Sequence, residues 1–257
     1  DQRPAACLLG HVWHPRRMRY GRLGFWYRLV VVVARPLLRL TTTWDWRAQD
    51  RVPKTGGVII AANHVSYVDP FALGLYVLEA GRVPKFLAKS SLFEHPLTRR
   101  IFIGANQIPV YRGTADAANA LRAAIDAVND GECLLIYPEG SATRDPDCWP
   151  MKARTGVARL ALETGAPVIP VAQWGPQNLW RYKAKLPSVM PPRKRLQMLA
   201  GEPIELSPYL GKPIDVDLLH EVTDLVMAKI TDLLIELRGG TPPKEVYDPR
   251  SGSGAAA

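Results

Sequence analysis

Residues 58–70, VIIAANHVSYVDP, decide the fold of this chain. Five apolar residues without polar alternation predict a buried strand. Pro70 is typical of the first turn of a helix, so the segment predicts a strand, a turn and a helix in succession. His64 therefore lies where the buried strand ends, and Asp69 follows it five residues later.

A histidine and a carboxylate at this spacing can form a base and its orienting partner. On a continuous helix the two side chains would lie more than about 100° apart, so the pair needs the bend between strand and helix. A hydrogen-bonded carboxylate fixes the tautomer of the imidazole and stabilises the imidazolium that forms on proton uptake. Two other interpretations stay open: Asp69 as the N-cap of the following helix, and His64 as an ordinary turn residue.

The composition is that of a basic chain with enough apolar residues for one large domain. Its 257 residues are 47% hydrophobic and carry a net charge of +9, which implies an anionic partner. Nucleic acid is disfavoured, because we find no Cys/His finger, no RNA-binding aromatic motif and no basic heptad. Cys7, Cys133 and Cys148 have neither metal-ligand spacing nor an even number, so we expect no metal and a reducing compartment.

Residues 1–47 are predicted to form a basic amphipathic helical arm that associates with a membrane. Over residues 23–40 one helical face is apolar and the opposite face is basic; the two sets are Trp26, Val30, Val33 and Leu37, and Arg28, Arg35 and Arg39. Packing of the apolar face on the chain's own domain is the open alternative. Pro36 is expected to divide this helix into two segments. No apolar run reaches the roughly 18 residues of a membrane span.

Strand and helix patterns alternate along the rest of the chain. This predicts an α/β fold with a mixed, partly parallel central sheet flanked by helices. Strands are expected at residues 58–62, 85–88, 107–111, 133–137, 167–172 and 197–200, and helices at 70–79, 96–101, 115–129, 155–164 and 215–237. We expect the α/β domain at residues 48–240. A C-terminal tail at 241–257 ends in SGSGAAA, which is typical of an appended flexible linker.

Further polar clusters lie at the ends of predicted strands or before a helix. Arg112 ends one strand and is suited to a bidentate contact with a phosphate. Glu139, Gly140, Ser141 and Arg144 follow the apolar strand at 133–137, where open α/β sheets bind their ligands. Lys152 precedes a predicted helix start, which attracts anions. Solvated cations and ordinary turns are the open alternatives.

Four blocks in this order resemble the glycerolipid acyltransferase family of the lysophosphatidate (1-acylglycerol-3-phosphate) acyltransferase type. They are N-H-x-x-x-x-D at 63–69, the strand that ends in Arg112, Pro-Glu-Gly at 138–140, and Pro-Val-Ile-Pro-Val at 167–171. The third block departs from the usual P-E-G-T-R, because Arg144 lies five residues after Glu139 instead of three. Whether Ser141 or Thr143 takes the hydroxyl position stays open.

The resemblance implies acyl transfer from acyl-CoA or acyl carrier protein to the free hydroxyl of lysophosphatidate, giving phosphatidate, without a cofactor and without an acyl-enzyme. The implied roles are general base for His64 and orienter for Asp69. Phosphate binding is implied for Arg112, Arg144 and Lys152, and substrate positioning or oxyanion stabilisation for Glu139, Gly140 and Ser141.

Other acceptors stay open, namely glycerol-3-phosphate or another lysophospholipid, and so does a non-catalytic peripheral lipid-binding protein. A hydrolase with Ser66 as nucleophile is disfavoured, because the chain has no G-x-S-x-G elbow. We expect a bacterial enzyme bound peripherally or monotopically at the cytoplasmic face of the cell membrane. Its expected partners are anionic lipids, lysophospholipid and acyl thioester, and not nucleic acid.

Overall fold

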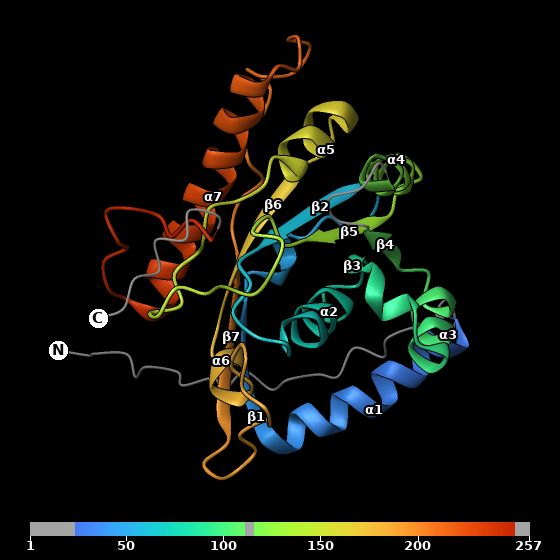
Figure 1. Ribbon diagram of the computed structural model, residues 1–257, viewed down its shortest axis with the longest axis vertical. Coiled ribbons are helices and arrows are strands. Elements are labelled where there is room, and N and C mark those ends of the chain that lie inside the picture. Colours follow the sequence, from blue (N-terminus) through green and yellow to red (C-terminus); the bar gives the residue numbers. More distant parts are fainter. Residues whose placement is uncertain (1–23, 111–115, 250–257) are drawn as a thin grey trace, which may run out of the picture.

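The computed structural model describes residues 24–110 and 116–249, which contain a seven-stranded sheet with helices on both faces (Figure 1). The strand order is β1-β7-β6-β2-β5-β3-β4. The strands are β1 Thr42–Arg47, β2 Val58–Ala62, β3 Pro84–Lys89, β4 Ile108–Val110, β5 Cys133–Ile136, β6 Val168–Trp174 and β7 Lys194–Ala200. Neighbouring strands are parallel except for β6 and β7, which are antiparallel. The predicted mixed, partly parallel α/β fold is confirmed.

Helix α2 covers one face of the sheet, and α4, α5 and α7 cover the other (Figure 1). The helices are α1 Phe25–Thr41, α2 Asp69–Glu79, α3 Pro96–Gly104, α4 Asp116–Asn129, α5 Gly156–Thr164, α6 Pro176–Leu179 and α7 Val216–Arg238. Helix α5 ends at Gly165, whose φ of 64° is left-handed, and α7 begins after Asp215, whose side chain accepts the N–H of Leu218.

Strand β2 lies at the centre of the sheet and is completely buried. Val58, Ile60 and Ala62 pack on the side of α2, whereas Ile59 and Ala61 pack on the side of α4, α5 and α7. Because successive side chains of a strand point to opposite faces, a strand covered on both faces needs apolar residues at every position. This requirement explains the uninterrupted apolar run that opens the deciding segment.

The predicted arm includes residues 42–47, but these form β1, an edge strand of the sheet that pairs in parallel with β7. Trp44 and Trp46 stack with ring centroids 4.4 Å apart and pack against the core on the α2 side. The alternation of Thr42, Trp44 and Trp46 with polar residues is the period of a half-buried strand. That signal is present in the sequence, and the prediction missed it.

Helix α1 continues through Pro36 to Thr41, so the predicted division at this proline is wrong. Proline removes the N–H that would bind the carbonyl of Val32. Val32 lies on an exposed part of the helix, with 67% of its surface accessible, so this loss falls on the solvent side. None of the helices in the described ranges is long and apolar enough to cross a bilayer.

Helix α1 has one packed face and one exposed apolar face. Val31 and Leu38 are buried in a cluster with residues of α2, and Arg35 forms an ion pair with Glu79 of α2 at 2.8 Å. The exposed apolar residues of α1 are Phe25, Leu29, Val32, Val33, Leu37 and Leu40. Of the predicted membrane face, Val33 and Leu37 are exposed, whereas Trp26 and Val30 are half-buried. The open alternative, packing on the chain's own domain, therefore holds for one face of this helix, and membrane association stays a prediction for the exposed face.

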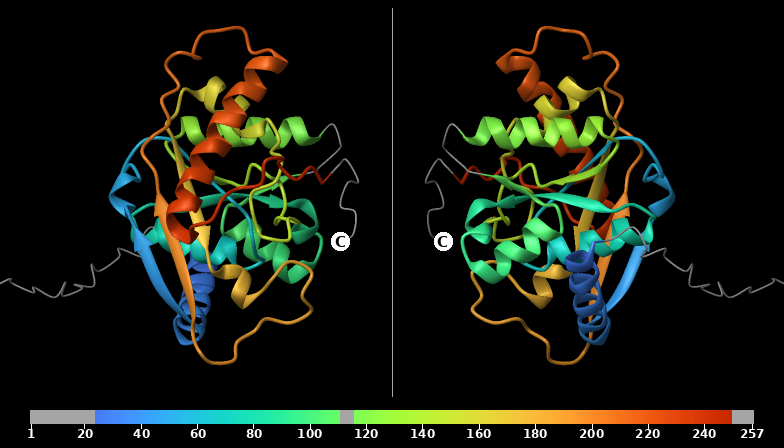
Figure 2. Two further views of the ribbon diagram at one scale, coloured as in Figure 1. Left: turned by 90° about the vertical axis from the view of Figure 1, so that its left-hand side faces the viewer. Right: turned by 90° about the vertical axis from the view of Figure 1, so that its right-hand side faces the viewer.

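Two segments later in the chain contact the rest of the domain. Arg193, at the end of the loop that joins α6 to β7, donates to the carbonyls of Arg39 and Thr42, so the loop lies against the end of α1 (Figure 2). In the described part of the predicted tail, the backbone carbonyl of Tyr247 accepts the N–H of Lys152 at 2.9 Å. The predicted tail is thus held against the domain at Tyr247 and Asp248.

Candidate active site

The candidate site lies at the carboxyl ends of β2 and β5, which are parallel neighbours in the sheet. His64 follows β2, and Tyr137 to Gly140 follow β5. Because parallel strands end at the same edge, the first and third sequence blocks meet there. The N–H of Thr143 donates to the carbonyl of His64 at 2.7 Å and joins the two loops directly.

The structure brings His64 and Asp69 together. Nδ1 of His64 lies 2.7 Å from Oδ2 of Asp69, and the side chain of His64 keeps 16% of its surface exposed while that of Asp69 keeps none. Burial raises the pKa of Asp69, although the hydrogen bond from His64 opposes this shift. A carboxylate at Nδ1 favours the tautomer that carries its proton there, which leaves the lone pair of Nε2 to accept a proton.

Asp69 is not the N-cap of α2, so that open interpretation is wrong. The N-cap is Val68, and Asp69 is the first residue of the helix. Its Oδ2 instead accepts the N–H groups of Val65 and Ser66, at 2.6 and 2.8 Å, from the turn before the helix. One carboxylate oxygen thus closes the turn and holds the imidazole.

Glu139 is a buried element of the site, with 4% of its surface exposed. Its Oε1 accepts the N–H of His64 at 2.8 Å, and its Oε2 accepts the N–H of Met151 at 2.9 Å. Burial raises the pKa of Glu139 to about 8. Both oxygens bind backbone groups, so this carboxyl group supports the loop that carries His64.

Two residues that the prediction left without a role support His64. The ring of Tyr137 stacks on the imidazole, with centroids 4.3 Å apart and planes 19° apart. Asn63 is fully buried; its Oδ1 accepts the N–H of Gln173 at 2.8 Å, and its Nδ2 donates to the carbonyl of Gln173 at 3.0 Å. Asn63 therefore ties the end of β2 to β6. The position of Asn63 directly before His64 was the only sequence signal that could have indicated this role.

The turn residues named as oxyanion donors differ in their surroundings. The N–H of Gly140 donates to the carbonyl of Tyr137 at 2.9 Å, and Gly140 has a φ of 76°. The turn therefore uses this N–H, and of the two predicted amides only that of Ser141 stays a candidate. The hydroxyl of Thr143 donates to the carbonyl of Trp149 at 2.7 Å, so it serves the loop.

Ser66 is unsuited to be a nucleophile. It is fully buried, and its Oγ donates to the carbonyl of Trp180 at 2.6 Å while accepting the N–H of Val68 at 3.1 Å. The serine instead fastens the segment after α6 to the turn that carries His64.

Among the described residues, the predicted phosphate-binding cations Arg144 and Lys152 do not line the same cavity. Arg112 lies outside the described residues. Arg144 is exposed and lines a cavity of about 200 Å³ with Val65 and Thr143. Lys152 forms an ion pair with Asp248 at 3.4 Å and keeps 53% of its side chain exposed. The cavity that Arg144 lines also includes Arg181 and Lys183, which lie outside the four sequence blocks.

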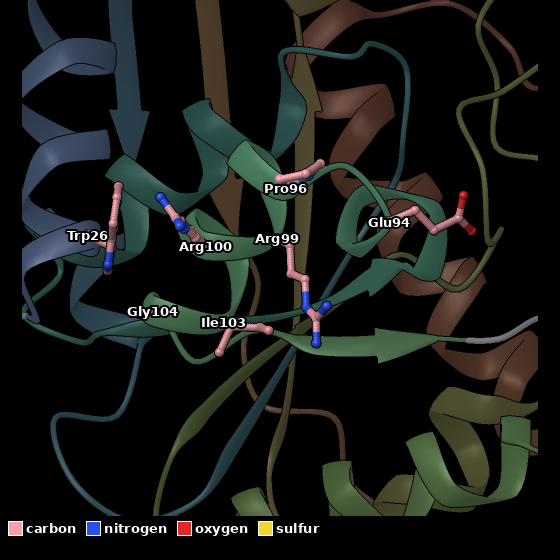
Figure 3. A pocket seen from close by; sticks show the side chains of 7 residues that line it. All are labelled: Trp26, Glu94, Pro96, Arg99, Arg100, Ile103 and Gly104. Atoms are coloured by element: carbon pink, nitrogen blue, oxygen red, sulfur yellow. The ribbon is translucent and has the colours of Figure 1, made fainter.

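A second hollow, of about 460 Å³, lies between α1 and α3 (Figure 3). Its lining residues are Trp26, Glu94, Pro96, Arg99, Arg100, Ile103 and Gly104. None of them contributes to the His64 cluster, so this hollow is separate from the candidate site.

Comparison with known proteins agrees with this architecture. Residues 45–174, about half of the chain, match the model of the acyltransferase family, and the chain belongs to this family. A crystal structure of the 1-acyl-sn-glycerophosphate (LPA) acyltransferase PlsC from Thermotoga maritima has a TM-score of 0.63 and covers 84% of this chain and 81% of its own. At 19% identity this likeness concerns the fold alone.

Relatives with curated names point in the same direction. A 1-acyl-sn-glycerol-3-phosphate acyltransferase of Borreliella burgdorferi is 31% identical over 132 residues, which are 51% of each chain. One of Bacillus subtilis is 24% identical over 72% of this chain and 85% of its own. An N-acylphosphatidylethanolamine synthase of Arabidopsis thaliana is 27% identical over 70% of this chain and 64% of its own. The chain spans 51% of the Borreliella relative, and 39% and 33% of two further 1-acyl-sn-glycerol-3-phosphate acyltransferases, from Cocos nucifera and Brassica napus. The resemblance found in the sequence is confirmed.

Proposed function

We propose that this protein transfers a fatty acyl group from acyl-CoA or acyl carrier protein to the free hydroxyl of lysophosphatidate, giving phosphatidate. The observation that carries the proposal is the 2.7 Å contact between His64 and the buried Asp69 at the carboxyl edge of the sheet. Most of the named relatives described above are 1-acyl-sn-glycerol-3-phosphate acyltransferases, which supports this choice of acceptor.

In the proposed reaction Nε2 of His64 takes the proton of the acceptor hydroxyl as its oxygen attacks the thioester carbonyl. Asp69 holds Nδ1 and stabilises the imidazolium that forms. The tetrahedral intermediate then expels the thiolate of the donor, which receives the proton from His64. Direct attack needs no protein nucleophile, no cofactor and no acyl-enzyme. The N–H of Ser141 is the proposed oxyanion donor.

We further propose that the protein acts on the surface of an anionic membrane, peripherally and at its cytoplasmic face, in a bacterial cell. The exposed apolar stripe of α1 supports this site, with Val33 at 57% and Leu37 at 59% exposure. The loop between α6 and β7 adds exposed apolar side chains at Leu186, Val189 and Met190, and Arg193 at its end contacts the end of α1. Apolar residues flanked by cations suit the interface of an anionic bilayer.

The chemical test measures release of the donor thiol with a panel of acceptors: lysophosphatidate, glycerol-3-phosphate, other lysophospholipids and phosphatidylethanolamine. The last acceptor is included because of the plant relative named above. We expect lysophosphatidate to be preferred, and His64→Ala to lower kcat by about 10²–10⁴-fold. The matched control is His220→Ala, at an exposed histidine of α7. No thiol release with any acceptor would favour the lipid-binding alternative, and substantial turnover of His64→Ala would contradict the mechanism.

The membrane test measures sedimentation with anionic and with zwitterionic vesicles. Val33→Asp with Leu37→Asp should abolish binding to anionic vesicles, because two charges then enter the apolar stripe. The control is Val216→Asp, at a valine of α7 that is 67% exposed. Unchanged vesicle binding of the α1 variant would contradict the role of this surface. Truncation is a poorer test, because removal beyond residue 41 takes away β1.

A further inference from the structure

The 200 Å³ cavity next to the His64 loop is basic, and two of its cations lie outside the four family blocks. Arg144 comes from the loop after β5, and Arg181 and Lys183 come from the segment after α6. The remaining lining residues are Val65, Thr143, Asp145, Pro146, Cys148 and Tyr182. Val65 directly follows His64, so the cavity borders the loop that carries the proposed base.

Contacts to both neighbouring loops fix the segment that carries Arg181. Arg181 forms a single antiparallel bridge with Ser66, and the hydroxyl of Ser66 donates to the carbonyl of Trp180. The guanidinium of Arg181 donates through Nη2 to the carbonyl of Pro146 at 2.8 Å. The backbone of Arg181 is thereby held beside the turn that contains His64, and its side chain is held beside the loop of Arg144.

The negative charge in this cavity is engaged elsewhere. Oδ1 of Asp145 accepts the N–H groups of Asp147 and Trp149, both at 3.0 Å, so this carboxylate closes its own loop. Cys148 is buried, which raises its pKa and keeps the thiol neutral. The cavity therefore presents three cations against one carboxylate that already has donors.

We propose that this cavity binds a phosphate group of a substrate, and that Arg181 and Lys183 are specificity-determining residues for it. The inference rests on the proposed function, since it adds Arg181 and Lys183, which lie outside the family blocks, to the phosphate contact already expected of Arg144. Arginine offers a planar pair of donors to phosphate, and lysine adds a point charge. Pockets for whole ligands measure about 300–1,000 Å³, so a cavity of 200 Å³ fits a charged part of a larger substrate.

Two substrates can supply this group: the monoester phosphate of lysophosphatidate, or a phosphate of the CoA nucleotide. Calorimetric titrations of the full chain separate them. One arm compares short-chain lysophosphatidate, below its micelle concentration, with the matching monoacylglycerol. The other compares CoA with pantetheine. In each pair only the first ligand carries the phosphate in question.

The variants are Arg181→Gln and Lys183→Gln, with the charge-conserving Arg181→Lys as a second arginine variant. The control is Lys185→Gln, an exposed lysine of the same segment that does not line the cavity. Both glutamine variants should weaken one phosphate-bearing ligand about tenfold or more, with the phosphate-free partner and the control unchanged. Arg181→Lys should recover part of the affinity. Steady-state KM for the same substrate should rise in parallel.

Weaker lysophosphatidate binding assigns the cavity to the acceptor headgroup, and weaker CoA binding assigns it to the donor. Affinities of both glutamine variants within twofold of the unaltered protein, for lysophosphatidate and for CoA, would overturn the proposal. Circular dichroism verifies that the variants fold. Because the titrations need no turnover, a chain that binds phosphate through Arg181 but transfers no acyl group would refute the proposed function and leave this site standing.

Discussion

The side-chain carboxyl group of Glu139 accepts the N–H of His64 at 2.8 Å, and so joins the loop after β5 to the loop that carries the proposed base. The other oxygen of Glu139 binds the N–H of Met151. Glu139 belongs to the third family block, but both of its side-chain oxygens accept backbone N–H groups, so we regard it as a positioning residue. Its substitution should therefore change the stability and arrangement of the site before it changes substrate contacts.

Stability should depend on pH through Glu139. Burial raises its pKa from 4.5 to about 8 in the folded chain, so the folded state holds a proton that the unfolded state releases in this range. The associated stability is complete below about pH 4.5 and is lost as the pH rises through 8. We measure the free energy of unfolding in urea and subtract the value of Glu139→Gln from that of the wild type. This difference should fall by about 1 kcal/mol or more over two pH units between pH 4.5 and 8. Glu245→Gln, at an exposed glutamate, is the control; a difference independent of pH would contradict this assignment.

Asp69→Asn should separate orientation from binding. The amide is of similar size, but it cannot hold the Nδ1 proton of His64 as a carboxylate does. We expect kcat to fall by about 10²–10⁴-fold with little change in KM for lysophosphatidate. Steady-state thiol release measures both quantities, and Asp126→Asn on the exposed side of α4 provides the comparison. A kcat within tenfold of wild type would show that the carboxylate is dispensable.

Asn63→Ala should destabilise the domain. It removes the paired hydrogen bonds between the fully buried Asn63 and the backbone of Gln173, and leaves two buried backbone groups of Gln173 without these partners. Such a loss costs about 2 kcal/mol or more. Urea unfolding measures it against Asn178→Ala, at an exposed position of α6. Equal stability of the two variants would mean that the strand ends are held by other contacts.

Gly104→Ala should loosen α1 from α3. A Cβ at Gly104 would lie 2.1 Å from Cδ1 of Trp26, so the indole must move. Amide hydrogen exchange in α1 should accelerate, and the double variant with Trp26→Ala should recover slow exchange because the obstacle is gone. Gly156→Ala is the matched control, because nothing lies within 4 Å of the added Cβ. Unchanged exchange in Gly104→Ala would show that the helices adjust without separating.

Local patterns in the sequence predicted most of the central elements. The apolar runs at residues 58–62 and 133–137 indicated strands buried on both faces. Successive side chains of such a strand enter the hydrophobic clusters on opposite sides of the sheet, so every position must be apolar. Gly165 and Asp215 marked helix ends because their conformations and caps act within one turn. Strand β1 was missed because its short alternating pattern was assigned to the preceding helical arm, and its partner β7 lies about 150 residues later in the chain.

The sequence by itself determined the α/β class, the family and the pairing of His64 with Asp69, because a strand, a turn and a helix within 13 residues set that geometry locally. Only the tertiary structure decided that Asp69 closes its turn instead of capping α2, that Glu139 supports the backbone of His64, and that Lys152 pairs with Asp248. It also placed Arg181 beside Arg144. The contacts of Glu139, Lys152 and Arg181 join segments that lie far apart in the sequence, so no local pattern carries that information. The bonds of Asp69 span at most four residues, but they depend on a turn conformation that the residue types alone do not specify.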